Sequence, residues 1–149
     1  MEKGVEIELV TEKDEEDIIE LLTDANLPIE DLTTDKLKNF LVARGKDGSV
    51  IGTVGVESYQ DVGLLRSLVV HPGYRGRGVG KELTKELESF ARQMGIKVLF
   101  LLTMTAVDFF PKLGYRVTQR SDVPYQVTET YEFKSACPVS AVCLYKDLM

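Results

Sequence analysis

The sequence is poor in residues that many common functional sites use. Its 149 residues contain no tryptophan, one histidine and two cysteines. The cysteines, Cys137 and Cys143, do not make a disulfide framework, and we expect both to be thiols. We expect no metal site. The single histidine, His71, lies in a turn after a predicted strand, and we assign it no catalytic role.

Long hydrophobic runs are also missing. No apolar stretch approaches the roughly 18 to 20 residues that span a membrane, and the charged start MEKGVEIELV lacks the layout of a signal peptide. We therefore expect a cytoplasmic protein with no membrane partner. The formal net charge of −6 argues against nucleic acid as the main partner. The length suits one domain, which we expect over residues 1–149.

The most informative stretch is a glycine-rich loop, residues 75–80, between a predicted strand and a predicted amphipathic helix. It reads Arg-Gly-Arg-Gly-Val-Gly. Glycines let the backbone turn its N–H groups toward a ligand, and a helix start adds N–H donors and the positive end of its dipole. The loop therefore predicts a phosphate or pyrophosphate site. A dinucleotide fingerprint would need a glycine at Lys81 and a P-loop would need one at Arg75, so neither motif fits.

The rest of the chain shows a pattern of strands and helices. Residues 5–10 alternate apolar and acidic side chains, as half-exposed strands do, and Thr11 with Asp14 resembles a capping box. We expect strands over 5–10, 39–43, 50–59, 64–70, 98–102, 115–118 and 141–145, the last at a sheet edge. We expect helices over 12–25, 29–37, 79–94 and 106–113, and a helical turn within 124–133. The acidic run 12–17 should be solvated, and Glu88 with Arg92 should pair on an exposed helix face.

The pattern Arg75-x-x-Gly78-x-Gly80 resembles the acetyl-CoA signature (Q/R-x-x-G-x-G/A) of the GNAT N-acetyltransferase superfamily. The resemblance covers roughly residues 50–115. It implies the acyl-CoA N-acyltransferase fold of that superfamily, of α/β (α+β) class, in which helices flank a central, mixed, largely antiparallel sheet. It also implies that loop amides hold the CoA pyrophosphate, and that backbone groups at the end of the preceding strand hold the pantetheine and polarise the thioester carbonyl. The acetyl-CoA-binding residues implied are Leu68, Val69, Val70, Arg75, Gly76, Arg77, Gly78, Val79, Gly80, Lys81, Thr103, Phe109 and Phe110.

The segment after strand 98–102 departs from the family pattern N-x-x-A-x-x-[LF]-Y. The usual asparagine is Thr103, which can still hydrogen-bond the cofactor. The tyrosine often proposed as general acid is Phe110, which cannot donate a proton. Tyr131 is our first candidate to replace it, with Tyr125 and Cys137 as others. Otherwise the thiolate leaves unaided, or the protein does not turn over.

Glu57 and Arg66 are charged residues in strands that otherwise look buried. Glu57 is the candidate general base, acting directly or through water, although the alternation of its strand also allows it to face solvent. A guanidinium within a buried strand needs a carboxylate, and a bidentate contact is its strongest option. For Arg66 that carboxylate is either Glu57 on the adjacent strand or one on the substrate, and both can hold in turn.

Segments outside the common core look like the arsenic-resistance-associated branch of these acetyltransferases. They are residues 26–28, 31–32, 63–70, 102–106, 109–110 and 130–141. In that branch a phenylalanine at position 110 is normal, and relatives acetylate the α-amino group of glutamate-like arsenical or phosphinyl amino acids. The resemblance implies that Arg66 holds a substrate carboxylate and that Asn26 and Thr103 line the amine pocket. For Cys137 and Cys143, arsenic ligation and a buried structural role are the two alternatives.

These features predict an N-acetyltransferase that moves acetyl from acetyl-CoA to a small amine by direct transfer in a ternary complex, with Glu57 as base. The acceptor is an amino acid or a glutamate-like arsenical or phosphinyl analogue. The partners considered are this substrate and a second copy of the chain in a homodimer. Two alternatives stay open. One is a non-catalytic acyl-CoA-binding regulatory module, which Phe110 suggests, and the other is an N-acetylglutamate synthase-like enzyme.

Overall fold

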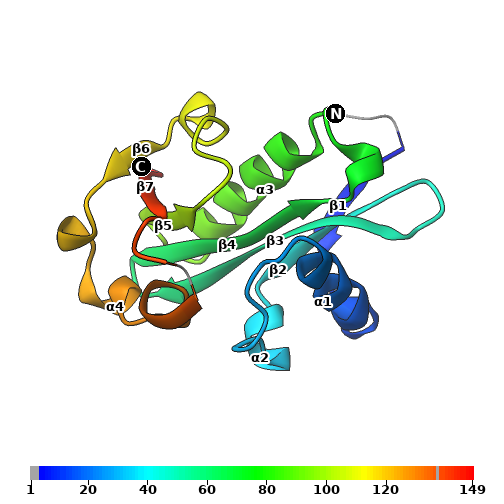
Figure 1. The fold of residues 1–149 in the computed structure, drawn as a ribbon. Coiled ribbons are helices and arrows are strands. Elements are labelled where there is room, and N and C mark those ends of the chain that lie inside the picture. Colours follow the sequence, from blue (N-terminus) through cyan, green and yellow to red (C-terminus); the bar gives the residue numbers. More distant parts are fainter. Residues whose placement is uncertain (1–3, 137) are drawn as a thin grey trace. The chain divides into compact units, whose positions relative to one another are not determined.

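The computed structural model describes residues 4–136 and 138–149, and Figure 1 follows the chain through its elements. The strands are β1 (Glu6–Leu9), β2 (Phe40–Arg44), β3 (Val50–Tyr59), β4 (Val62–Val70), β5 (Val98–Thr103), β6 (Arg116–Thr118) and β7 (Val142–Asp147). The α-helices are α1 (Glu15–Asp24), α2 (Thr34–Leu37), α3 (Val79–Gln93) and α4 (Tyr125–Thr128). Short 3-10 turns add Glu12–Asp14, Pro72–Tyr74, Pro111–Leu113 and Arg120–Asp122, and a π-helical turn covers Glu132–Ala136.

The described residues form two compact units. One combines the chain up to Val56 with Ser67–Phe90, and the other combines Glu57–Arg66 with the chain from Ala91 onward. Strands β3 and β4 contribute to both units, and the strands are hydrogen-bonded in the order β1-β2-β3-β4-β5-β7-β6. The predicted mixed, largely antiparallel sheet with helices is confirmed. A single domain over the whole chain stays a prediction.

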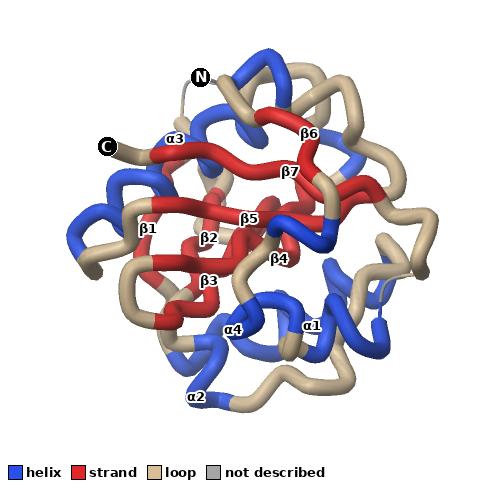
Figure 2. Tube along the Cα trace, turned by 90° about the vertical axis from the view of Figure 1, so that its left-hand side faces the viewer, coloured by secondary structure: helices blue, strands red, loops and turns tan. Residues whose placement is uncertain are grey.

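The first unit carries a helix on each face of its strands (Figures 1 and 2). Strand β2 pairs antiparallel with β1 and β3, so that Leu41 lies opposite Leu9 on one side and Val54 on the other. Phe40 and Val42 point to one face, where they pack with Ile18, Leu21 and Leu22 of α1 and with Leu37 of α2. On the opposite face Gly52 makes room for α3, because a Cβ there would lie 3.1 Å from a methyl carbon of Leu83.

The predicted capping box is present, and it caps the 3-10 turn Glu12–Asp14 that leads into α1. The Thr11 N–H donates to Asp14 Oδ2 at 2.8 Å, and the Thr11 hydroxyl donates to the same oxygen at 3.0 Å. Asp14 is buried, however, and Arg44 of β2 donates to its two carboxylate oxygens at 3.0 and 2.7 Å. The expectation that the whole acidic run is solvated is therefore wrong at Asp14. Its ion pair with Arg44 connects the residue before α1 to β2.

We expect acid to weaken this ion pair. Burial alone would raise the pKa of Asp14, but hydrogen bonds from Arg44 and Thr11 outweigh it and hold the pKa below its ordinary value of 3.8. Such a carboxyl contributes stability above its unfolded-state pKa and loses it as the pH falls through the folded-state pKa. Replacing Asp14 by asparagine should lower the free energy of unfolding at pH 7 by about 1–3 kcal/mol, with a smaller difference below about pH 3.

Urea unfolding at a series of pH values measures this loss. Asp17→Asn is the matched control, because Asp17 lies one turn along on an exposed position. Equal losses in the two variants, or a loss in the Asp14 variant that does not change with pH, would contradict the account.

In the second unit, β5 lies between β4 and β7. Its parallel register with β4 places Val62 beside Val98, and its antiparallel register with β7 places Phe100 opposite Tyr145. Strand β6 pairs with the other side of β7, so β7 is internal and its predicted edge position is wrong (Figure 2). The reason is burial: Leu144 of β7 is fully buried, whereas Val117 of the short strand β6 is 66% exposed. One face of this unit packs Leu64, Phe100, Val123, Val127, Phe133 and Cys143 together.

Two predicted helices and one predicted helix face need correction. The segment 29–37 is helical only in α2, and 106–113 forms turns that end in a 3-10 turn at Pro111–Leu113, because proline lacks the N–H that a continuing helix needs. Helix α3 and its glycine end are confirmed, since Gly95 has φ +88°. Glu88 is not on an exposed face: it is 5% exposed and continues the buried row of Thr84 and Ala91.

None of the helices in residues 4–136 and 138–149 combines the length and hydropathy of a membrane span. The same residues bring together no group of three histidine, cysteine, aspartate or glutamate side chains that could hold a metal ion.

Candidate functional site

The glycine-rich loop lies in the first unit and takes the shape that the sequence predicts. Gly76 and Gly78 have φ angles of +78° and +83°, a left-handed conformation that costs other residues roughly 1–2 kcal/mol. Both are exposed, whereas Val79, the first residue of α3, is 1% exposed and fixes the helix start in the core. The loop therefore presents its backbone to solvent beside an anchored helix N-terminus, as an anion site requires.

Basic side chains surround this helix start. The Arg75 Nε donates to the Val70 carbonyl at 3.0 Å, a bond that does not use its two terminal nitrogens. The Arg77 guanidinium lies 5.4 Å from the centre of the Tyr74 ring. Arg75, Arg77 and Lys81 are all exposed, and the first turn of an α-helix has N–H donors without intrahelical acceptors. The residues present thus fit the phosphates of a CoA molecule in charge and in donor type.

Strand β4 contains an unusual backbone conformation just before its last three residues. Ser67 has φ +62° in the middle of the strand, which is uncommon for a residue other than glycine and is found preferentially at functional sites. It directly precedes Leu68, Val69 and Val70, the residues expected to hold pantetheine. Nothing in a single sequence marks a serine for this conformation, so the sequence analysis missed it.

His71 has a structural role in the turn that follows. Its backbone N–H donates to the Ile51 carbonyl at 2.7 Å, and its ring Nδ1 accepts a hydrogen bond from the Gly73 N–H at 3.0 Å. The imidazole therefore caps the 3-10 turn Pro72–Tyr74, which gives His71 a structural role.

The second unit contains a buried cluster of charged side chains. Arg66 is 2% exposed, and its Nη1 donates to Glu57 Oε2 at 2.7 Å. Its Nε lies 3.4 Å from Glu132 Oε2. The Tyr59 hydroxyl donates to Glu57 Oε1. Glu57 is 7% exposed and Glu132 4%, so the internal Arg66–Glu57 pair is confirmed and the solvent-facing alternative for Glu57 is wrong.

Strand geometry explains part of this cluster. Strand β3 ends at Tyr59 and β4 begins at Val62. In a hairpin with a two-residue connection the residues that flank the turn lie opposite each other, and side chains two residues apart share a face. Glu57 and Tyr59 therefore lie on the same face as Arg66. This counting could have found Tyr59 from the sequence. Glu132 was missed, because no local pattern connects the tail to β4.

The other predicted residues occupy varied environments. The Thr103 hydroxyl oxygen accepts a hydrogen bond from the Ala106 N–H at 2.9 Å and caps the turn after β5. Phe110 is 4% exposed, and its ring makes edge contacts with Phe109 and Tyr115. Asn26 is exposed, with φ +57°, and follows the end of α1.

Among the proposed proton donors, Tyr131 is half-buried and Tyr125 is 74% exposed, while Cys137 lies outside the described residues. Burial raises the pKa of Cys143 to about 11, so it is a protonated thiol at neutral pH. Cys143 is also 3% exposed and packs with Phe100 and Phe133, so the buried structural role is confirmed for this cysteine.

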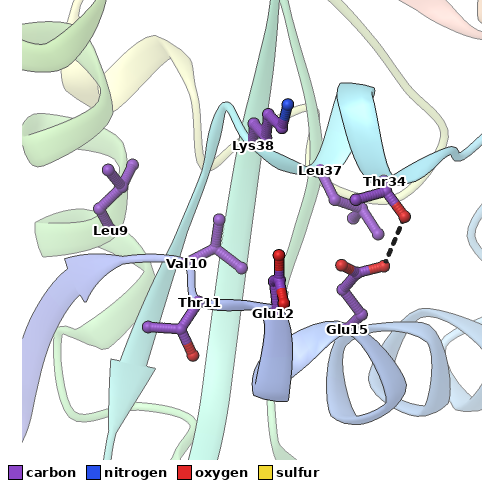
Figure 3. A pocket seen from close by; sticks show the side chains of 8 residues that line it. All are labelled: Leu9, Val10, Thr11, Glu12, Glu15, Thr34, Leu37 and Lys38. Atoms are coloured by element: carbon purple, nitrogen blue, oxygen red, sulfur yellow. Dashed lines mark hydrogen bonds between the residues drawn. The ribbon is translucent and has the colours of Figure 1, made fainter.

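A pocket of about 220 Å³ lies in the first unit (Figure 3). Its walls come from the end of β1, the start of α1, and α2, and Thr34 donates to Glu15 Oε1 across it at 3.1 Å. The lining residues are Leu9, Val10, Thr11, Glu12, Glu15, Thr34, Leu37 and Lys38. None of them was predicted to bind cofactor or substrate, and we assign this pocket no role.

Comparison with known proteins places these features in a family. Residues 7–115 match the acetyltransferase (GNAT) family. The amino-acid acetyltransferase of Mannheimia succiniciproducens is 30% identical over 91 residues, which are 60% of this chain and 21% of that protein. The amino-acid acetyltransferase of Yersinia enterocolitica is 33% identical over 75 residues, or 50% of this chain and 17% of that protein. The match thus spans about a fifth of the length of these relatives.

Solved structures show the same fold. An N-acetylglutamate synthase from Neisseria gonorrhoeae, complexed with coenzyme A and N-acetyl-glutamate, has a TM-score of 0.85 at 20% identity, over 100% of this chain and 36% of that one. Rv2747 from Mycobacterium tuberculosis, in complex with CoA, has a TM-score of 0.83 at 20% identity, over 97% and 99%. The predicted fold and the predicted family are confirmed. By its family match and its fold, this chain belongs to the acetyltransferase (GNAT) family.

Proposed function

We propose that this protein acetylates the amino group of an amino acid or a close analogue that carries a carboxylate. The observation that carries the proposal is the buried Arg66, a guanidinium held among carboxylates in a polar cluster. A planar guanidinium matches a carboxylate with two parallel hydrogen bonds and distinguishes it from neutral groups. The names of the curated relatives, amino-acid acetyltransferases, support the same acceptor class.

We assign cosubstrate binding to the residues that the loop motif implies. The N–H groups of residues 76–81 and the side chains of Arg75, Arg77 and Lys81 would hold the phosphates. The backbone of Leu68–Val70 would hold the pantetheine and polarise the carbonyl, and Thr103, Phe109 and Phe110 would also contact the cofactor. Bound acetyl-CoA supplies an acetyl group activated as a thioester.

Glu57 has the chemistry of a general base. Arg66 and Tyr59 each donate to one of its oxygens, and an ionised carboxylate has about four acceptor sites, so further ones are open to a proton. In our proposal Glu57 takes a proton from the substrate ammonium, directly or through water. The freed nitrogen lone pair then attacks the acetyl carbon. As the carbon–sulfur bond breaks, Tyr131 donates a proton to the sulfur. The nitrogen then loses its second proton, which returns to the Tyr131 oxygen through solvent and leaves a neutral amide. Asn26 and Thr103 line the amine pocket in this proposal.

The loop assignment predicts an effect on cosubstrate affinity. Replacing Gly76 by alanine should weaken acetyl-CoA binding about tenfold or more. The left-handed backbone at φ +78° costs alanine roughly 1–2 kcal/mol, so the loop should leave the conformation in which its N–H groups hold the phosphates. Gly48→Ala is a matched control: Gly48 has φ +84°, lies in the β2–β3 hairpin, and like Gly76 has open space at its Cβ position. Calorimetric titration should show unchanged affinity for the control. Equal affinity in both variants would remove Gly76 from the site.

The finer identity of the acceptor is also a proposal. Glutamate-like arsenical or phosphinyl amino acids would follow from the branch resemblance, and glutamate itself would follow from an N-acetylglutamate synthase-like activity. A non-catalytic acyl-CoA-binding module is the alternative that Phe110 motivates. A cytoplasmic location and a homodimer stay predictions.

Free-thiol release from acetyl-CoA tests the proposed function. The panel includes glutamate, its arsenical and phosphinyl analogues, other amino acids, polyamines and aminoglycosides. Saturable release with a carboxylate-bearing amine is expected. Release only with amines that lack a carboxylate would overturn the acceptor class. If no amine of the panel causes thiol release, while acetyl-CoA still raises the melting temperature of the protein, the binding module is favoured.

A further inference from the structure

The buried cluster contains one cation and two carboxylates. Arg66 contacts Glu57 of β3 and Glu132 of the tail, and each of these three side chains is at most 7% exposed. Burying a carboxylate is expensive unless its charge is compensated. Two carboxylates thus share one buried guanidinium, so Arg66 already holds a carboxylate in a second position beside Glu57.

The two carboxylates are held in different ways. Glu57 lies in the ten-residue strand β3 and also accepts a hydrogen bond from Tyr59. Glu132 begins a π-helical turn that follows α4. Turns of this type are rare and are frequently found at functional sites. Moving Glu57 away from Arg66 would require a change in the sheet, whereas moving Glu132 would require a change in one short turn of the tail.

We propose that Glu132 is a specificity-determining residue: it occupies on Arg66 the place that the carboxylate of the acceptor takes. This inference rests on the proposed function and extends it. In the empty enzyme Glu132 keeps the buried guanidinium paired. An acceptor must then displace a carboxylate that is tethered nearby and present at high effective concentration. Only an acceptor whose own carboxylate replaces it is held, so amides and plain amines are rejected.

Removing the Glu132 carboxylate tests, without any acetyl transfer, whether another carboxylate can take its place on Arg66. Glu132→Ala should leave a carboxylate-shaped vacancy beside Arg66, and sodium acetate should fill it. We expect acetate to raise the melting temperature of this variant saturably, by about 3 °C or more relative to sodium chloride of equal ionic strength. The wild type should not respond. Glu129→Ala is the matched control, because Glu129 lies in the same tail but forms an exposed pair with Lys134 at 3.0 Å.

The role of Arg66 is tested in the same assay by adding Arg66→Met to the Glu132→Ala variant. Loss of the acetate response in this double variant supports the proposal. No response in Glu132→Ala, or an equal response in the double variant, overturns it. If Glu132→Ala folds only in acetate, that rescue is itself the expected result. If it folds in neither salt, the isosteric variant Glu132→Gln replaces it in the assay. If the melting temperature of Glu132→Gln responds to acetate no more than that of the wild type, the proposal is overturned.

This assay reads unfolding, so its outcome is independent of whether any amine in the panel is acetylated. Once an acceptor is known, Glu132→Gln should lower its KM about tenfold and leave kcat within twofold. It should not change the KM of the corresponding carboxamide by a similar factor.

Discussion

Replacing Arg66 by methionine is expected to lower the free energy of unfolding by about 3–5 kcal/mol, the cost of leaving buried charges without their partner. The Arg66 side chain is fully buried, and the side chains of Glu57 and Glu132 around it are 7% and 5% exposed. Without the guanidinium both carboxylates must stay charged in a poorly solvated place or bind protons. Urea or guanidinium chloride unfolding at pH 7 measures the loss.

Two further variants separate charge from packing. Combining Arg66→Met with Glu57→Gln and Glu132→Gln removes the whole set of charges and should recover most of the lost stability, because neutral groups do not carry the same desolvation cost. Arg44→Met should cost less, since Glu8, one of the partners of Arg44, is 45% exposed. An Arg66 variant that loses less than about 1 kcal/mol, or a triple variant no more stable than the single one, would contradict this view of the cluster.

Replacing Glu57 by glutamine is expected to lower kcat by about 10²- to 10⁴-fold, which is the usual contribution of a general base. Glutamine keeps the size of the side chain and a hydrogen-bond acceptor for Arg66, but it cannot take a proton from the substrate ammonium. The affinity for acetyl-CoA should stay within about twofold, because Glu57 has no assigned cosubstrate contact. Steady-state rates and calorimetric titration of acetyl-CoA measure the two quantities.

Tyr59→Phe is the matched control for this result. It removes the hydroxyl that donates to Glu57 Oε1 but leaves the carboxylate able to act as a base. We expect a much smaller fall in kcat than for Glu57→Gln. An unchanged kcat in Glu57→Gln would remove Glu57 from the mechanism, and a fall that is matched by lost acetyl-CoA affinity would make its role structural.

The features that could be predicted from the sequence depend on neighbouring residues. The loop 75–80 is one example, since the φ angles of Gly76 and Gly78 follow from the missing side chain. The capping box of Thr11 and Asp14 spans three residues, and the Arg66–Glu57 pair follows from counting along two strands joined by a tight turn. In each case local geometry is enough to bring the groups together.

The features that could not be predicted depend on contacts between distant segments. Glu132 reaches Arg66 from 66 positions along the chain, and Asp14 reaches Arg44 across 30. The position of β7 between β5 and β6 depends on strand pairing between segments that lie far apart in the sequence. The conformation of Ser67 opposes its intrinsic preference, so only the surrounding structure can impose it.

The most direct test of the proposed function is the ratio of kcat/KM for an amino acid acceptor and for its carboxamide, with the product identified by mass spectrometry. The two amines differ only in the group that Arg66 is proposed to recognise. A ratio of about 100 or more in favour of the carboxylate, with the acetyl group on nitrogen, is the predicted result. Equal values for the pair would contradict carboxylate recognition, and an absence of acetylated product from any amine would contradict the enzyme itself.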